Sequence, residues 1–404
     1  MKDKQIEKLI KSEEKRQKGV INLIPSENYV SPDVLKALGS IFDNKYAEGY
    51  PTARYYGGQE NTDKLEILCQ GRALKLFGLS DKKPLDGAPK ESISPTWHVN
   101  VQPLSGGPAN LAVYLGVVPL GGKIMGLPLS SGGHLSHGQN VSITGKAWRQ
   151  VPIFLNTGTE LIDYERMAKD ALSEKPALIV VGFTAYPRIV DFKKCREIAD
   201  SAGSLLMVDM SHFAGLVAGR AYPSPFEYAD IVTTTTHKTL RGPRGAIIFS
   251  RKDARELWKK IDKAVFPGLQ GGPHMSQIAG IAVALKEADS SSFKKYAEAV
   301  VKNAKALSEE LKKLGWRIVS GGTDSHLVLV DTWMDGAGVP GREAEARLER
   351  AGIIVNKNTI PGEKRSPFDP SGIRMGSPAE TTRGKKEKDF VAIARKIDKV
   401  LKGK

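Results

Sequence analysis

The stretch ALIVVGFTAYPRIVDFKKCREIADSAGSLLMVD, residues 177–209, decides the fold of the chain. It opens and closes on apolar runs, 177–181 and 204–208, whose length and aliphatic content predict buried strands. Between them, residues 192–202 carry a helical pattern that ends at Gly203. A strand, a crossover helix and a second strand form a βαβ unit, in which the two strands run parallel.

The segments around this unit extend it into a larger α/β fold. Strand-like runs at 231–235 and 246–249 predict further members of a mostly parallel, doubly wound sheet. A chain of 404 residues exceeds what one hydrophobic core usually organises. We therefore expect an N-terminal arm and active-site loop over 1–58, a large α/β domain over 59–274, and a smaller C-terminal α+β domain over 275–404.

The chain is basic, with 60 Lys and Arg against 45 Asp and Glu and a formal net charge of +15. A positive charge of this size favours binding to nucleic acid. The lysines alternate with glutamates along helical patterns at 2–18, 252–263 and 385–404, as solvated helix faces do. The sequence has no zinc-finger spacing, RNP-like aromatic pattern or long arginine-rich arm. We expect no nucleic-acid partner, and the charge suits anionic substrates or cofactors equally well.

Other patterns bear on the cellular compartment. No run approaches the roughly 18 uninterrupted apolar residues of a membrane span, and residues 1–18 are charged without an apolar signal core. Cys69 and Cys195 lie in helix-like segments far apart in the sequence, which is typical of a reducing compartment. We predict a cytoplasmic protein with no membrane partner.

Polar side chains follow each predicted strand of the central sheet. Thr184 comes after the first strand, Asp209 and His212 after the second, and His237 and Lys238 after the third. Because open α/β sheets bind ligands at the carboxyl ends of their strands, we expect a carboxylate, an imidazole and an amine to face one crevice.

Lys238 is the strongest candidate for chemistry. It follows four threonines, 233–236, and precedes a glycine-rich segment. An amine at a strand end can form a Schiff base with an aldehyde, and the nearby Arg241 and Arg244 would lower its pKa. Asp209 is the carboxylate that a pyridinium nitrogen needs in pyridoxal phosphate chemistry. The alternatives are that Lys238 only binds phosphate and that Asp209 only caps a loop.

The segment SGGPAN at residues 105–110 has features of a phosphate site. Its glycines free backbone N–H groups, Pro108 suits the first position of a helix, and a helix N-terminus favours an anion. A plain helix cap is the alternative.

His134 and His137 have the spacing of metal ligands, but the sequence offers no third ligand nearby, so we expect no metal. Stacking of His134 on a planar cofactor is a better use of this ring.

Several long motifs resemble those of serine hydroxymethyltransferase, and the resemblance runs from Leu23 to about Gly384. The motifs are NLIPSEN (22–28), NKYAEGY (44–50), RYYGG (54–58), VDMSH (208–212), TTTTHKTLRG (233–242), VFPGLQGGP (265–273) and VNKN (355–358).

This resemblance implies a fold type I transferase that uses pyridoxal phosphate. Lys238 would hold the cofactor, Asp209 would pair with its pyridine nitrogen, and His134 would stack on its ring. Tyr56 and Gly272 would come from a neighbouring subunit, which makes the active site a property of a homodimer or of a tetramer. The implied cofactor contacts of the chain also include Ser105, Gly106, Gly107, Thr184, His212 and Thr235.

The resemblance also implies substrate contacts. Arg374 would grip the substrate carboxylate with help from Ser26. Glu48 would exchange a proton with the serine hydroxyl or the folate nitrogen, and Tyr46 would position the substrate. His237 is linked in the family to reaction specificity. The implied folate contacts are Leu129, Gly133, Leu135, Asn358, Ser366, Pro367 and Phe368.

The expected reaction is the reversible transfer of the hydroxymethyl carbon of serine to tetrahydrofolate, which gives glycine and 5,10-methylenetetrahydrofolate. The alternatives are a folate-independent aldolase for threonine or other β-hydroxy amino acids, and a basic nucleic-acid-binding protein on an enzyme fold.

The chain departs from the family pattern at two positions. Gly107 stands where the family usually has a serine whose hydroxyl contacts phosphate, and Ser131 stands where the family often has His or Asp. Residues 80–95 are rich in Pro, Asp and Lys and predict an exposed insertion.

Overall fold

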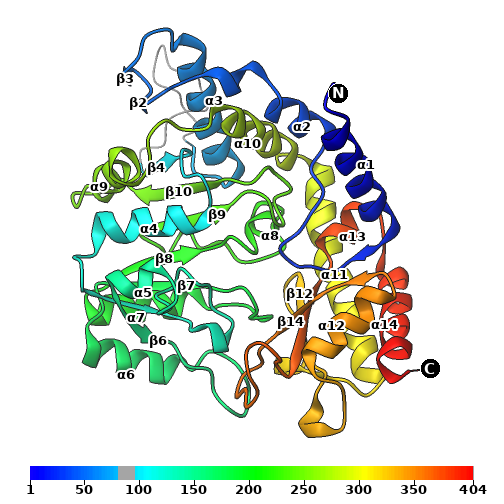
Figure 1. Cartoon of the computed structure of the whole chain (residues 1–404). Coiled ribbons are helices and arrows are strands. Elements are labelled where there is room, and N and C mark those ends of the chain that lie inside the picture. Colours follow the sequence, from blue (N-terminus) through cyan, green and yellow to red (C-terminus); the bar gives the residue numbers. More distant parts are fainter. Residues whose placement is uncertain (81–95, 404) are drawn as a thin grey trace.

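The βαβ unit predicted from residues 177–209 is present at the centre of the fold. Strand β7 (Leu178–Gly182), helix α7 (Phe192–Ala202) and strand β8 (Leu205–Asp209) follow one another, and the two strands pair in parallel with Gly182 opposite Asp209. These elements belong to the computed structural model of the chain, which describes residues 1–80 and 96–403 (Figure 1). Apart from Ser80, the insertion expected at 80–95 lies outside the described residues.

Among the described residues, the large sheet has seven strands in the order β4-β10-β9-β8-β7-β5-β6. Only β10 is antiparallel to its neighbours, and every other pair is parallel. The predicted α/β class with a mostly parallel sheet is thus confirmed. The remaining strands are β4 (Trp97–Asn100), β5 (Lys123–Gly126), β6 (Arg149–Pro152), β9 (Ile231–Thr235) and β10 (Ala246–Arg251).

Alternate residues of the central strands enter two separate cores, one on each face of the sheet. Val181 and Val208 belong to one core, whereas Val180 and Met207 belong to the other. Successive side chains of a strand point to opposite faces, so parallel strands covered on both sides are apolar throughout. Besides α7, the first core contains residues of α3 (Glu60–Leu76), α6 (Tyr164–Glu174), α8 (Ala214–Ala218) and α10 (Met275–Ala288), and the second contains residues of α4 (Gly106–Val117) and α9 (Leu257–Lys263).

The C-terminal part is built on an antiparallel sheet of four strands within the described residues, in the order β11-β12-β15-β14. Helices pack against it around a core of its own. The elements of this part are α11 (Ser291–Lys313), β11 (Arg317–Ile318), β12 (Leu327–Asp331), α12 (Gly341–Arg350), β13 (Ile353–Ile354), β14 (Asn356–Asn358), β15 (Gly372–Gly376), α13 (Pro378–Thr382) and α14 (Glu387–Lys402).

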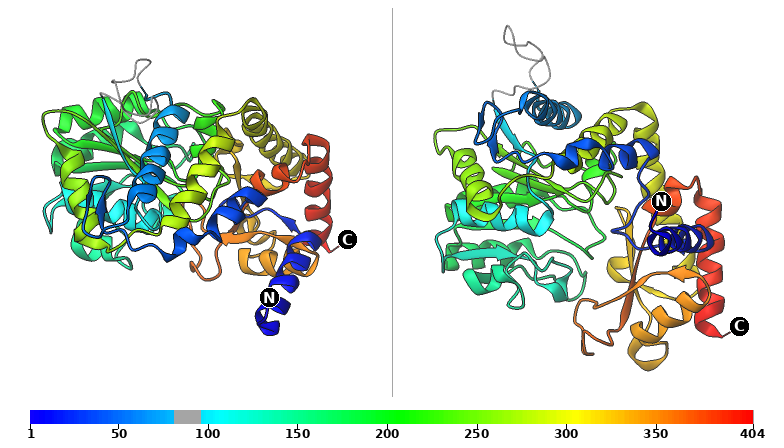
Figure 2. Two further views of the ribbon diagram at one scale, coloured as in Figure 1. Left: turned by 90° about the horizontal axis from the view of Figure 1, so that it is seen from above. Right: turned by 45° about the horizontal axis from the view of Figure 1, so that its top comes forward.

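The N-terminal segment joins this C-terminal part. Strand β1 (Ile21–Asn22) pairs in parallel with β13, and Leu23 is fully buried in the C-terminal core. Helix α1 (Lys4–Gly19) lies on the same side of the molecule in all views (Figures 1 and 2). The remaining elements are α2 (Pro32–Leu38), β2 (Gly49–Tyr50), β3 (Ala53–Arg54), α5 (Ile143–Ala147) and the short helical turns η1 (Ile41–Asn44), η2 (Leu129–Ser131), η3 (Ala264–Leu269), η4 (Val319–Gly321) and η5 (Met334–Gly336).

Helix α11 is shared between the large and the C-terminal cores. Its residues Phe293 and Val300 pack in the large core, whereas Ala304 and Leu311 pack in the C-terminal core. Helix α10 belongs entirely to the large core. The change of core therefore falls inside α11, about one helix later than the boundary expected at residue 275. Within the described residues, no helix combines the length and the apolar composition that a membrane crossing requires.

Candidate active site

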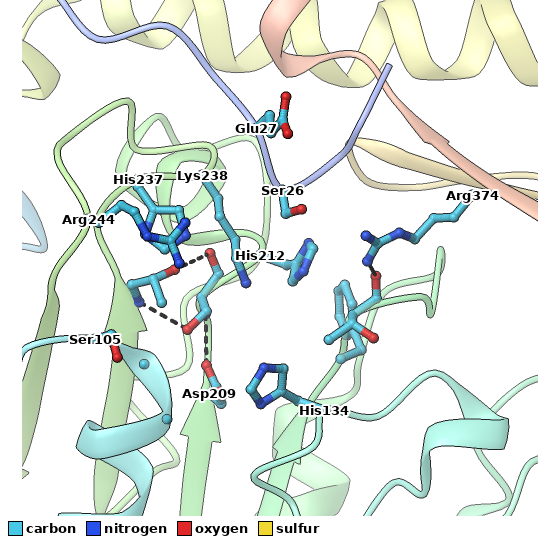
Figure 3. A pocket seen from close by; sticks show the side chains of 16 residues that line it. Ser26, Glu27, Ser105, His134, Asp209, His212, His237, Lys238, Arg244 and Arg374 are labelled. Carbon is cyan, nitrogen blue, oxygen red and sulfur yellow. Dashed lines mark hydrogen bonds between the residues drawn. The ribbon is translucent and has the colours of Figure 1, made fainter. Parts of the chain in front are cut away.

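A cavity of about 400 Å³ lies where the carboxyl ends of β7, β8 and β9 meet the C-terminal part and the N-terminal segment (Figure 3). The strand-end residues expected to meet, Thr184, Asp209, His212 and Lys238, do line one cavity. Its lining consists of Ser26, Glu27, Ser105, Gly106, Gly107, His134, Phe183, Thr184, Asp209, Ser211, His212, Thr235, His237, Lys238, Arg244 and Arg374.

Lys238 presents a buried amine to this cavity. The residue is 8% exposed, and within the described part of the chain its Nζ atom makes no hydrogen bond or ion pair. Burial lowers the pKa of Lys238 to about 8, and the positive charges of Arg374 and Arg244 act in the same direction against the opposing charge of Asp209. An amine with a lowered pKa is a nucleophile at neutral pH.

The expectation that Arg241 lowers this pKa is wrong. Its guanidinium lies over the ring of Tyr296, 4.8 Å from the centroid, and it is absent from the charges that act on Lys238. Because Arg241 has a positive φ of 61°, the backbone turns there and carries the side chain away from the cavity. Arg374, which is distant in the sequence, takes the place that Arg241 was expected to fill.

Asp209 ends strand β8 and is held by three neighbours. Its Oδ2 atom accepts a hydrogen bond from Nδ2 of Asn110 at 2.8 Å and lies 3.2 Å from Nε2 of His137, while Oδ1 accepts from the backbone N–H of Ser211 at 3.0 Å. Burial acts to raise the pKa of Asp209, but the hydrogen bond and the charge of His137 outweigh it and hold this pKa below its usual value. The cavity therefore contains an ionised carboxylate at neutral pH.

The start of helix α4 closes the cavity on another side. The helix begins at Gly106 and not at Pro108, which is its third residue, and the hydroxyl of Ser105 makes no hydrogen bond to the helix end. A Cβ atom on Gly106 would lie 2.6 Å from Cγ2 of Thr235, whereas one on Gly107 would meet nothing within 4 Å. The backbone N–H groups of the first turn are thus open to an anion, and Gly106 allows the close approach of strand β9.

Arg374 reaches the cavity from strand β15. Its Nε atom donates to Oδ1 of Asn356 at 3.0 Å, and Nη1 donates to the carbonyl oxygen of Thr184 at 2.7 Å. Burial lowers the pKa of Arg374 to about 10, so the group remains charged at neutral pH. No carboxylate of the described residues pairs with it, and a buried cation of this kind calls for an anionic ligand.

Three more predicted residues lie around the cavity. His134 holds its Nδ1 atom 2.7 Å from Oγ of Ser136, and burial lowers its pKa to about 4. The Thr184 hydroxyl donates to the carbonyl oxygen of Gly133 at 2.9 Å, which fixes the loop that carries His134. Burial lowers the pKa of His237 to about 3, and its buried Nδ1 atom has no partner among the described residues.

Four predicted residues form a separate group outside the cavity lining. The Tyr46 hydroxyl lies 3.4 Å from Oε1 of Glu48, and the rings of Tyr46 and Tyr56 meet edge to face at 5.2 Å. Gly272 lies against Tyr46 and Glu48, so that a Cβ atom there would be 3.8 Å from the tyrosine ring. Tyr46 is 59% exposed and Tyr56 44% exposed. The structure thus brings these four together but not into the cavity of the same chain.

The residues expected to contact folate are also absent from the cavity lining. Leu129, Leu135 and Phe368 have exposed side chains, and Asn358 uses its amide on the carbonyl oxygen of Thr359. The other three, Gly133, Ser366 and Pro367, lie in the same loops, 129–135 and 366–368.

Sequence reasoning left several residues of this site without a role. Asn110 and His137 contact Asp209, and the Ser211 hydroxyl accepts the backbone N–H of Thr235 at 3.0 Å. Each stands inside or next to a motif singled out above, but no local pattern shows which side chain it will meet. Glu27 and Phe183 also line the cavity.

The fold and this arrangement define a class of protein. An α/β domain with a buried, unpaired lysine after one strand, an ionised carboxylate after the next, and a glycine-rich helix start beside them is the arrangement of fold type I pyridoxal phosphate-dependent enzymes.

Comparison with known proteins gives the family. The chain belongs to the serine hydroxymethyltransferase family, whose sequence model matches residues 1–397. It is 51% identical to serine hydroxymethyltransferase of Desulfotalea psychrophila over 399 residues, which is 99% of this chain and 88% of that protein. It is 48% identical to the cytosolic enzyme of Saccharomyces cerevisiae (99% and 85% covered) and 50% identical to the enzyme of Caenorhabditis elegans (97% and 77%). These findings support the expected family and neither of the two alternatives.

Proposed function

We propose that the protein catalyses the reversible transfer of the hydroxymethyl carbon of serine to tetrahydrofolate, giving glycine and 5,10-methylenetetrahydrofolate. The observation that carries the proposal is the pairing, in one cavity, of a buried amine on Lys238 with a buried guanidinium on Arg374 that has no carboxylate partner among the described residues. The amine of Lys238 suits an aldehyde cofactor, and the guanidinium of Arg374 suits the carboxylate of an amino acid.

The residues of the cavity fit pyridoxal phosphate. Lys238 would hold it covalently, the first turn of α4 from Ser105 to Gly107 would receive its phosphate, and the ionised Asp209 would keep its ring nitrogen protonated. The bound group supplies an electron sink for the carbanion left when the hydroxymethyl carbon departs. Further cofactor contacts in this proposal are His134, Thr184, His212 and Thr235.

Arg374 and Ser26 are the proposed contacts of the substrate carboxylate. A guanidinium fixed by Asn356 and Thr184 has a set direction, which orients the bond to be broken in the amino acid. Because His237 has a lowered pKa, it stays neutral beside Lys238 and adds no charge to the site. Its proposed role is in reaction specificity.

The group formed by Tyr46, Glu48, Tyr56 and Gly272 is proposed to complete the cavity of a second copy. The side chains of Tyr46 and Tyr56 are exposed, as are the apolar residues Ile41 (84%) and Leu35 (59%). Exposed apolar and aromatic side chains that gather on one segment mark an interaction surface. In a homodimer, or a tetramer of two such dimers, Glu48 would then exchange the proton of the serine hydroxyl or the folate nitrogen.

The folate site is proposed to lie where the loops 129–135 and 366–368 approach this shared cavity. The exposed side chains of Leu129, Leu135 and Phe368 offer apolar surface to a planar pterin and its aryl group. Gly133, Asn358, Ser366 and Pro367 complete the proposed set.

We place the enzyme in the cytoplasm. Cys69 and Cys195 are buried free thiols, which a reducing compartment maintains. The printed name of the yeast relative describes that protein as cytosolic.

The test is a product assay on the purified full-length protein loaded with pyridoxal phosphate. Serine with tetrahydrofolate should give glycine and 5,10-methylenetetrahydrofolate in equal amounts, and Lys238→Ala should abolish both products while the fold is retained by circular dichroism. Glycine formed from serine or threonine at the same rate without folate would replace the transferase by the aldolase. Absence of any product with the cofactor bound would overturn both.

A further inference from the structure

Two histidines from the two parts of the molecule meet at the edge of the cavity. His212 follows strand β8 of the large sheet and lines the cavity, whereas His326 directly precedes strand β12 of the C-terminal sheet. Nδ1 of His212 lies 3.1 Å from Nε2 of His326, and the rings stack with their centroids 5.3 Å apart. Both residues are buried, at 2% and 0% exposure. In Figure 3 the His212 ring lies between Lys238 and Arg374.

Both rings are neutral at neutral pH. Burial holds the pKa of His212 well below its usual value and lowers that of His326 to about 3. The charges of Lys238 and Arg374, which act on both rings, push the two pKa values in the same direction. A neutral imidazole has one N–H donor and one acceptor nitrogen, so the close contact contains a single proton.

The position of this proton follows from the other nitrogen of His326. Its Nδ1 atom is buried and has no partner within the described part of the chain. An orphaned buried N–H group is rarer in folded proteins than an orphaned acceptor. Nδ1 of His326 is therefore the unprotonated nitrogen, and Nε2 carries the proton that is donated to His212. Since Nδ1 of His212 accepts this proton, the proton of His212 itself lies on Nε2.

The geometry points to His326 as a positioning residue that fixes His212 in its Nε2–H form, so that the cavity presents an N–H donor to an anionic oxygen held there. Within the described residues, Nε2 of His212 has no protein partner, which leaves it available to a ligand. The identity of the ligand rests on the proposed function, in which His212 is a contact of pyridoxal phosphate, a group that carries anionic oxygens. The tautomer itself needs no ligand.

The arrangement makes this donor depend on the C-terminal part of the molecule. The carbonyl oxygen of His326 accepts the backbone N–H of Ser377 at 3.0 Å, and strand β12 pairs with β15, which carries Arg374. One small sheet thus sets both the proposed grip on the substrate carboxylate and the donor form of His212.

The first test is nitrogen NMR of the full-length protein with ¹⁵N-labelled histidine, before and after pyridoxal phosphate is added. The chain has seven histidines, and the His212 signals are assigned by their change in His326→Phe. The proposal predicts a protonated Nε2 and an unprotonated Nδ1 on His212 in both samples. A protonated Nδ1 on His212 in the ligand-free protein overturns it, whatever the cofactor result.

The second test compares two variants in the loaded enzyme. His326→Phe keeps the ring shape and loses the donor, whereas the amide of His326→Gln can still donate to Nδ1 of His212. We expect His326→Phe to shift the absorbance maximum of the bound cofactor and to lower kcat about tenfold with the KM for serine little changed, as the loss of one buried hydrogen bond predicts. His326→Gln should restore both values. Equal behaviour of the two variants contradicts the positioning role, and failure of the native protein to bind pyridoxal phosphate contradicts the proposed function instead.

Discussion

Nη1 of Arg374 donates a hydrogen bond to the main-chain oxygen of Thr184 at 2.7 Å, which joins strand β15 of the C-terminal sheet to the end of strand β7 in the large sheet. The same side chain donates to Asn356 through Nε. Two of the five N–H donors of the guanidinium are therefore used inside the protein, and the other three, one on Nη1 and two on Nη2, are left for a ligand.

The first prediction concerns this guanidinium. Arg374→Lys keeps the charge but cannot reach Thr184, Asn356 and a carboxylate together, so we expect the KM for serine to rise by about 10- to 100-fold. Initial-rate kinetics at saturating tetrahydrofolate give this value. Asn356→Ala serves as the matched control, since it removes one support of the fork and keeps the guanidinium, and its KM should rise less than that of Arg374→Lys. The reverse order would show that position 374 does not bind the carboxylate.

A second prediction follows from the lowered pKa of Lys238, about 8. Only the unprotonated amine attacks an aldehyde, so the rate at which the cofactor-free protein combines with pyridoxal phosphate should rise with pH up to about 8 and then level off. Stopped-flow absorbance between pH 6 and 10 measures this rate. Because the charge of Arg244 helps to lower this pKa, Arg244→Met should move the inflection to higher pH. A rate that does not change from pH 6.5 to 9 is incompatible with this assignment.

The third prediction is that substitutions at the adjacent residues Gly106 and Gly107 have different effects. Gly106→Ala places a methyl group 2.6 Å from Thr235, and the resulting shift of strand β9 or helix α4 should cost about 1–3 kcal/mol of stability and weaken cofactor binding. Gly107→Ala meets nothing within 4 Å and should leave both nearly unchanged. Thermal unfolding and cofactor titration compare the two variants. Gly107→Ser should bind pyridoxal phosphate more tightly, because it adds a hydroxyl at the site of the phosphate. Equal losses at positions 106 and 107 would refute the assigned geometry of the helix start.

The fourth prediction concerns Arg54, which holds the segment that carries Tyr46 and Glu48. Its buried guanidinium contacts the carboxylates of Asp63 and Glu66 at 2.8 and 2.6 Å and donates to the carbonyl oxygens of Ala47 and Gly49. Arg54→Met leaves the buried Glu66 without its cation and should cost about 3–5 kcal/mol of stability. Chemical denaturation measures the loss. Glu66→Gln together with Arg54→Met should recover part of it, and a double variant no more stable than Arg54→Met would contradict the ion pair as the cause.

Local patterns were enough to predict the centre of the fold. The runs at 177–181 and 204–208 are apolar on both faces, and the helix between them ends at a glycine, so β7, α7 and β8 follow from a few neighbouring residues each. The boundary between the two cores was harder, because the helical pattern of α10 does not tell which core its apolar face will meet. That choice depends on contacts with distant segments.

The same distinction holds for the candidate site. The residues that follow the strands could be predicted to face one cavity, because parallel strands end at one edge of the sheet. The expected effect of Arg241 on the pKa of Lys238 was wrong, because closeness in sequence does not fix the direction of a side chain after a turn. The contacts of Asp209 with Asn110 and His137, and the contact between His212 and His326, could not be predicted, because the residues in each contact are between 72 and 114 positions apart.

Helix α11 runs without interruption for 23 residues, which is a rod of about 34 Å, and it supplies side chains to both cores. The chain cannot lose one core without fraying the rod that supports the other, so the two parts should melt as one cooperative unit rather than in succession. A fragment that begins at residue 275 would expose the apolar faces of α10 and of the first half of α11 to water, and one that ends there would expose the part of the large core that these faces cover. The two parts are separate in shape, but their stabilities are coupled through α11.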